Sequence, residues 1–269
     1  MAYTFGGTTG DDLTWTESTS NWGATQRSGL ICGWYYPTTL TAGRALWSVG
    51  AVHRAVIAAT TSEIDLWFDR TTDTQWRTSG LGLATNTWHF IAFLNNSFNT
   101  GPVTNWKVWR SVGTDIPTPV TVSQIAAGSG NATSNTVVTV GNIEAAGTSA
   151  FEGDIGRFDY FVGTLANSFI DNTNGSIGAE AERIAFEQVV IPIWKGEFPT
   201  FLKSGTQSNN SITHITWDFD LVNPRGISYK NGGTIQTNNR SATVNAVFSQ
   251  NRRPIPQLNQ LGSFDRVRR

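Results

Sequence analysis

Acidic residues recur in one short stretch, SEIDLWFD, and they are the side chains best spaced to do chemistry. A retaining glycosidase needs two carboxylates about 5–5.5 Å apart across the bond that it cleaves. Residues i and i+2 of a strand point to the same side, roughly 6.5–7 Å apart. Glu63 and Asp65 therefore share one face of a predicted strand and form the candidate catalytic pair, with Asp69 further along.

The spacing departs from that of the laminarinase-like sandwich glycosidases, whose catalytic strand this stretch resembles. That family carries a Glu, an Asp and then a second Glu two or three positions after the Asp. Trp67 and Phe68 hold those positions here, and the third acid is the later and shorter Asp69. A hydrolase is therefore the least favoured function, and the alternation favours a structural strand. Its polar face would carry Glu63, Asp65, Trp67 and Asp69, and its core face Ile64, Leu66 and Phe68.

The other chemistry-bearing residues form no motif. His53, His89 and His214 lack metal-ligand spacing, and the single Cys32 excludes an internal disulfide. The chain contains no nucleophile elbow, P-loop or dinucleotide fingerprint. We therefore expect no catalytic residue and no cofactor.

Composition narrows the classes of partner. The net charge of −1 and the 14% of charged residues do not favour nucleic acid or an anionic membrane. No run of eighteen apolar residues occurs, so no membrane span is expected. The first residues lack the basic and apolar regions of a signal peptide, which predicts synthesis and folding in a cytoplasm.

Short β-type runs separated by turn residues recur throughout the chain. They predict an all-β fold of two packed antiparallel sheets, a β-sandwich or jelly roll. Residues 164–172 and 179–188 are predicted short helices, with Pro192 ending the second, and 128–136 is a predicted flexible loop. The predicted strands are 29–36, 44–51, 54–60, 63–69, 74–79, 87–95, 105–112, 136–143, 156–163, 212–220, 226–230, 234–237 and 242–248.

The domain division predicted from these runs is a sandwich over 1–225 and a C-terminal part over 226–269. The second part begins with a hairpin around 230–234 and ends in a basic, extended arm without periodicity. The interleaved prolines favour an extended peptide that docks on protein. The predicted partner-binding residues of the arm are Arg252, Arg253, Pro254, Pro256, Arg266, Arg268 and Arg269.

Three segments carry a family pattern in order: LICGWYYPT (30–38), NTWHFIAFL (86–94) and VGNIEAAGTSAFEGDIGRFDYF (140–161). A weaker fourth match is WKVWRSVG (106–113). The pattern resembles the laminin-G-like, concanavalin A-like sandwich domains over about residues 25–222. Phe90 and Gly156 depart from it, where the family usually has His and Asp. The matching residues are Ile31, Gly33, Trp34, Pro37, Trp88, His89, Ile91, Ala92, Gly141, Phe151, Gly153, Ile155, Phe158 and Tyr160.

The resemblance implies a fold that hosts lectins, glycosidases, adhesion modules and virion proteins, so it leaves the function open. Many relatives bind calcium through loop acids, and Asp154 and Asp159 are the candidate ligands here. Aromatic side chains are expected to fill the space between the sheets. The predicted core positions are Trp34, Phe68, Trp88, Ile91, Phe93, Val138, Val140, Phe158 and Trp217.

Two functions remain in competition. The first is a non-catalytic structural protein of a bacteriophage particle, either a capsid decoration or cement protein or a tail component. It would dock on other virion proteins, or on itself, through the arm, and would be localised in the virion. The second is a carbohydrate-binding adhesin module for polysaccharide such as that of a host surface. The candidate sugar-stacking residues are Trp15, Trp22, Trp76, Trp106 and Trp109.

Overall fold

The computed structural model describes residues 2–8, 12–16, 27–68, 70–96, 105–132, 137–143, 149–164, 179–197, 212–217 and 226–228. Most of them belong to antiparallel strands. The strands are β1 (Tyr3–Gly6), β2 (Leu13–Thr16), β3 (Arg27–Pro37), β4 (Ala45–Val49), β5 (His53–Ile57), β6 (Ile64–Phe68), β7 (Arg70–Thr72), β8 (Thr74–Ser79), β9 (His89–Asn96), β10 (Asn105–Val112), β11 (Thr118–Ala126), β12 (Ser129–Ala132), β13 (Val137–Val140), β14 (Glu152–Thr164), β15 (Ile212–Trp217) and β16 (Gly226–Ser228).

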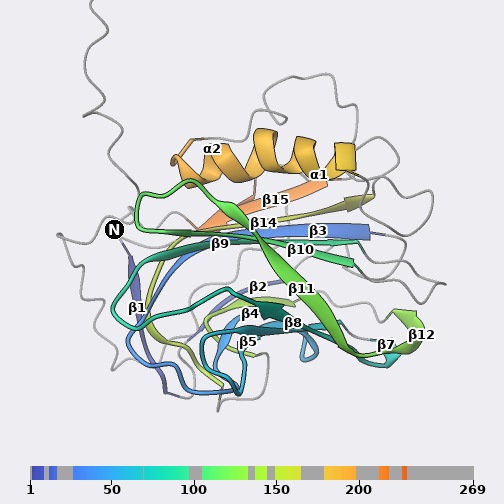
Figure 1. Ribbon diagram of the computed structural model, residues 1–269, viewed down its shortest axis with the longest axis horizontal. Helices are drawn as coiled ribbons and strands as arrows, with labels where there is room; N and C mark the ends of the chain where they lie inside the picture. The colour runs from blue at the N-terminus through green and yellow to red at the C-terminus, as the bar shows by residue number, and fades with distance from the viewer. Residues whose placement is uncertain are drawn as a thin grey trace, which may run out of the picture.

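The strands form two packed sheets joined at one edge, as Figure 1 shows. The first sheet has the order β16-β15-β14-β3-β9-β10, with β1 also paired to β14, and the second has the order β8-β6-β5-β4-β13-β2. Strand β11 pairs with β10 over its first residues and with β8 from Thr121 onward, so it crosses from one sheet to the other. The predicted all-β, two-sheet sandwich is confirmed.

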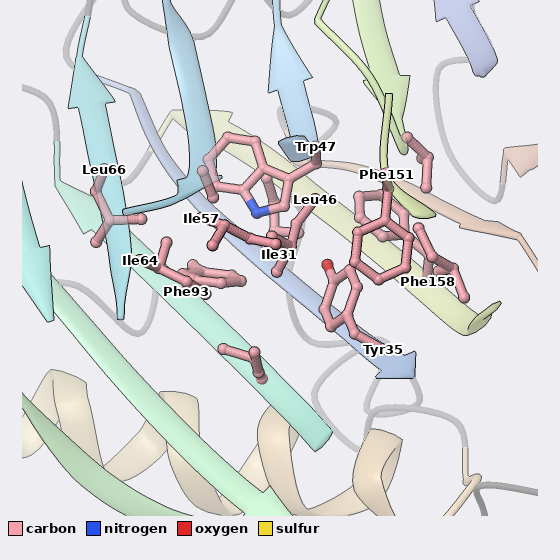
Figure 2. Close-up of a cluster of buried hydrophobic side chains, with 14 of the residues drawn as sticks. Ile31, Tyr35, Leu46, Trp47, Ile57, Ile64, Leu66, Phe93, Phe151 and Phe158 are labelled. Atoms are coloured by element: carbon pink, nitrogen blue, oxygen red, sulfur yellow. The ribbon is translucent and has the colours of Figure 1, made fainter. Parts of the chain in front are cut away.

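The main hydrophobic core lies between the two sheets, where side chains from both inner faces meet (Figure 2). Trp47 of the second sheet packs against Phe93 of the first, with ring centroids 5.6 Å apart. The alternation predicted for β6 is confirmed, because Ile64, Leu66 and Phe68 are all fully buried in this core.

A helical segment covers the outer face of the first sheet, and Figure 1 shows it above β14 and β3. It consists of α1 (Ala179–Ala185), the π-helical turn η1 (Phe186–Val190) and α2 (Ile191–Trp194). Val189, Val190 and Ile193 pack there on apolar side chains of β3, β9, β10 and β14, so the first sheet is buried on both faces. Trp34 is buried as predicted, but in this helix-side core and not between the sheets. The segment within 179–188 was predicted to be helical, but nothing in its sequence indicated which face of the sandwich it would cover.

Pro192 does not end the helix as predicted. The Ile191 N–H bonds back to the carbonyl of Phe186, five residues earlier, which closes the π-helical turn. Pro192 then falls in the first turn of α2, directly after the π-helical turn. The chain therefore stays helical through Trp194.

Further differences from the predictions follow from weak local signals. Strand β12 occupies part of the predicted loop 128–136, because it pairs with β7 to form a separate two-stranded sheet. Strands β1, β2, β7 and β11 were also missed, since they are short or rich in Thr and Ser. Strand β16 pairs with β15 and so extends the first sheet past residue 225, while the domain division itself stays a prediction. The segments 164–172, 230–234, 234–237 and 242–248 lie wholly or largely outside the described residues, as does the side chain of Trp217.

Candidate functional site

The carboxylate of Glu63 supports the turn after β8. It accepts hydrogen bonds from the backbone N–H of Gly80 (2.9 Å) and Leu81 (3.2 Å) and from the hydroxyl of Thr78 (2.7 Å). A carboxylate held by two backbone N–H groups and a hydroxyl is fixed in place, with most of its acceptor sites used. This geometry suits a structural role better than attack on a sugar.

Asp65 is likewise held by a protein partner. Its two oxygens accept hydrogen bonds from Nε and a terminal nitrogen of Arg77, at 2.6 and 2.8 Å, in a bidentate ion pair between neighbouring strands. The favoured interpretation of this strand therefore fits the structure for Glu63 and Asp65. Asp69 lies outside the described residues.

The two candidate calcium ligands both have protein partners. Asp154 is buried and accepts a hydrogen bond from the Thr4 hydroxyl (2.7 Å). Asp159 is fully buried, and its two oxygens accept hydrogen bonds from Arg157 at 2.7 and 3.1 Å. In the part of the chain that the structure describes, no three His, Cys, Asp or Glu side chains cluster as a metal site would require. Calcium binding stays a prediction.

The five tryptophans predicted to stack on sugar lie in different environments. Trp106 and Trp109 are only 4% and 2% exposed, which corrects the expectation of open ring faces at these two positions. Trp76 is half-buried and packs against the sandwich core. Trp15 belongs to β2, but its side chain, the whole of Trp22 and the C-terminal arm (251–269) lie outside the described residues.

A groove of about 340 Å³ opens at the edge of the helix-side core, next to Trp109. The floor comes from β10 and β11, where Trp109 pairs in register with Pro119. The wall comes from α1 and the first residue of η1. Its lining residues are Trp109, Pro119, Glu182, Arg183 and Phe186.

Two aromatic rings stack in this groove. The rings of Trp109 and Phe186 lie 5.8 Å apart between centroids with 27° between their planes. Trp109 is almost wholly covered, whereas Phe186 remains partly exposed and presents apolar surface to the groove. Phe186 also begins the π-helical turn, a local irregularity that is frequent at functional sites.

Charged side chains of both signs border the groove. Lys107 of β10 and Glu182 of α1 form an ion pair at 2.8 Å, and Arg183 pairs with Glu187 one turn further along. These four side chains are all partly or largely exposed, so such pairs are weak and their donors and acceptors can exchange to a ligand. The groove thus combines an aromatic wall with a hydrogen-bonding rim, the combination that binds one face of a ring bearing hydroxyl groups.

Glu182, Arg183, Phe186 and Lys107 were not predicted as site residues. The sequence feature that could have indicated them is the charged segment 179–188 with its single aromatic residue Phe186. This feature does not indicate that the segment packs beside Trp109. That meeting depends on the long-range docking of the helix on β10.

Comparison with known proteins does not assign this chain to a family. No protein-family model and no curated protein matches this sequence. Among solved structures, a Bacteroides ovatus protein described as a candidate for carbohydrate binding matches with 13% identity and a TM-score of 0.43, over 88% of this chain and 59% of that chain. Domains LG4-5 of the mouse laminin α1 chain match with 15% identity and a TM-score of 0.34, over 55% of this chain and 40% of that chain. This chain thus spans less than two thirds of either structure.

No helix among the described residues is both long and apolar enough to cross a membrane.

Proposed function

We propose that this protein is a non-catalytic carbohydrate-binding module and that the groove beside Trp109 binds a glycan. The observation that carries the proposal is the partly exposed Phe186 ring, stacked on Trp109 in a groove that Glu182 and Arg183 also line, with the ammonium group of Lys107 paired to Glu182. The groove volume of about 340 Å³ lies in the range of small-ligand sites, roughly 300–1,000 Å³.

The parts of the groove match the two sides of a sugar ring. Phe186 and Pro119 supply apolar surface for the C–H face of a pyranose. Glu182 can accept hydrogen bonds from hydroxyl groups, while Arg183 and Lys107 can donate to them. The stacking of Phe186 on Trp109 holds the ring in place before a ligand arrives, which lowers the entropic cost of binding.

Replacing Phe186 by alanine should weaken glycan binding at least about fivefold, because an aromatic contact is worth roughly 1 kcal/mol beyond the area that it buries. A glycan array identifies the ligand, and isothermal titration then compares the variants. Phe186→Tyr keeps the ring and should bind as the unchanged protein does. Lys195→Gln, exposed at the end of α2 and outside the groove lining, controls for local damage. An array without any bound glycan would refute the proposed function, whereas equal affinities of Phe186→Ala and Phe186→Tyr would move the site away from this groove.

The sequence also led us to predict that the module works in a bacteriophage particle, as a capsid decoration or tail component. This part of the proposal rests on composition and on the basic arm (251–269), which lies outside the described residues. The two roles are compatible, because a virion protein can hold polysaccharide of the host surface. Removal of 251–269 should abolish co-assembly with the partner without changing the groove, as measured by light scattering of the mixture. Unchanged co-assembly would refute the role of the arm.

A further inference from the structure

The outer face of the second sheet carries a row of polar and aromatic side chains. Strand register places Arg54 of β5, Trp67 of β6 and Gln75 of β8 beside one another. All three are half-buried, and they point away from the core because Ile64, Leu66 and Phe68 occupy the alternate positions of β6. The next row along the strands holds Asp65, Arg77 and Ser123.

The two arginines of this face differ in their partners. Arg77 is neutralised by the bidentate pair with Asp65. Arg54 instead lies over the indole of Trp67, with its guanidinium carbon 5.1 Å from the ring centroid, and donates one hydrogen bond to the carbonyl of Ala51 (3.1 Å). No carboxylate in the described ranges lies within ion-pair distance of Arg54, and Asp73 acts on it only from further away.

The environment of Arg54 strengthens its attraction for an anion. Burial lowers the pKa of Arg54, and the negative charge of Asp73 opposes this effect without cancelling it. The guanidinium stays protonated, but it has lost part of its hydration, and no carboxylate of the described residues forms an ion pair with it. A charge that is already partly dehydrated forms stronger hydrogen bonds with an incoming carboxylate than a fully exposed arginine does.

We propose that this face is a second saccharide-binding site and that it takes a sugar unit bearing a carboxylate group. Arg54 contacts the carboxylate, the part of the Trp67 indole left exposed beside Arg54 contacts the sugar ring, and Gln75 and Ser123 are placed to bond hydroxyl groups. The interpretation as a sugar site rests on the proposed binding function, whereas the preference for an anion rests on Arg54 alone.

The two sites lie on opposite sides of the sandwich. The groove belongs to the helix-covered outer side of the first sheet, and the Arg54 face is the outer side of the second sheet, with the main core between them. One chain can therefore contact two glycan chains at once. Such a protein would bridge polysaccharides even as a monomer.

The test compares two forms of one polysaccharide: de-esterified homogalacturonan, which carries free carboxylates, and its highly methyl-esterified form, in which most carboxylates are blocked. Each is titrated against the full-length protein in low salt. We expect at least about tenfold tighter binding of the de-esterified form, in line with one charge-assisted hydrogen-bonding contact. Arg54→Gln should lose this preference and bind both forms alike. Lys195→Gln removes the same charge from an exposed position at the end of α2 and should keep the preference.

Bridging is read separately, as turbidity of soluble de-esterified polymer mixed with the fraction of the protein that light scattering shows to be monomeric. The unchanged chain should produce turbidity, and either Arg54→Gln or Phe186→Ala should remove it. Equal affinity of the unchanged chain for the two polymers, or a preference that survives in Arg54→Gln, would overturn the second site. Binding of an acidic protein but of neither polymer would overturn it as well. These results leave the proposed function standing if the glycan array still shows ligands that depend on Phe186.

Discussion

Lowering the pH from 7 to 4.5 is expected to destabilise this protein by about 2.5 kcal/mol through His53 alone, a large part of a typical folding free energy. His53 is 1% exposed on β5, and its ring meets the Phe68 ring edge-on, with centroids 4.2 Å apart. Burial, assisted by the positive charge of Arg70, lowers the pKa of His53 from 6.5 to about 3.

The direction of the effect follows from which state binds the proton. Above pH 6.5 the histidine is neutral in the folded and unfolded chains, so it contributes no pH dependence. Below pH 6.5 the unfolded chain takes up a proton that the folded chain refuses until about pH 3, its folded-state pKa. Stability is therefore lost as the pH falls through this window, at about 1.4 kcal/mol per pH unit.

Urea denaturation at several pH values between 7 and 4.5 measures this slope. His53→Phe keeps a ring beside Phe68 and should flatten the curve by nearly the whole His53 contribution. Burial also lowers the pKa of His89, so a smaller slope of the same sign should remain in that variant. If the curves of the unchanged protein and of His53→Phe run parallel, His53 is protonated in the folded state and the prediction is wrong.

Local patterns carried most of the sandwich prediction. The alternation of Ile64, Leu66 and Phe68 with polar neighbours indicates one buried face without any knowledge of the rest of the chain. Trp34 shows the limit of this reasoning. Its strand β3 is buried on both faces because a helix far along the chain packs on the outer one, and alternation alone cannot distinguish the two cores.

The groove could not be predicted from the sequence either, because it also depends on the helix that packs on the first sheet. Trp109 was selected as an aromatic residue of a strand, which indicated a possible contact surface but not its burial. Phe186 lies far along the chain from Trp109, and it stacks on Trp109 only because α1 and η1 dock over β10. The Arg54 face could be predicted in part, because the sequence pattern already placed Trp67 on the polar face of its strand.

Gly153→Ala is expected to cost more than about 4 kcal/mol of stability, or to prevent folding, because it places a methyl group inside a sheet contact. Gly153 lies in β14, between Phe5 of β1 and Pro37 of β3, with a φ of +141°. A Cβ there would lie 2.1 Å from the carbonyl oxygen of Tyr36 and 2.9 Å from Cα of Pro37. Both are backbone atoms, which cannot move aside as a flexible side chain can.

A second glycine with a positive φ shows what an added methyl group costs where nothing obstructs it. Gly43 also has a positive φ, +82°, but a Cβ added there would meet nothing within 4 Å. Gly43→Ala should therefore cost only the conformational penalty of an L-residue, about 1–2 kcal/mol. Urea denaturation, with the soluble yield of each variant, gives the comparison. Equal losses at the two positions would show that β3 and β14 separate easily at this point. A much larger loss at Gly153 would explain why the segment 151–155 resembles the glycine-containing motif of laminin-G-like domains, since only glycine lets β14 approach β3 so closely at the joint with β1.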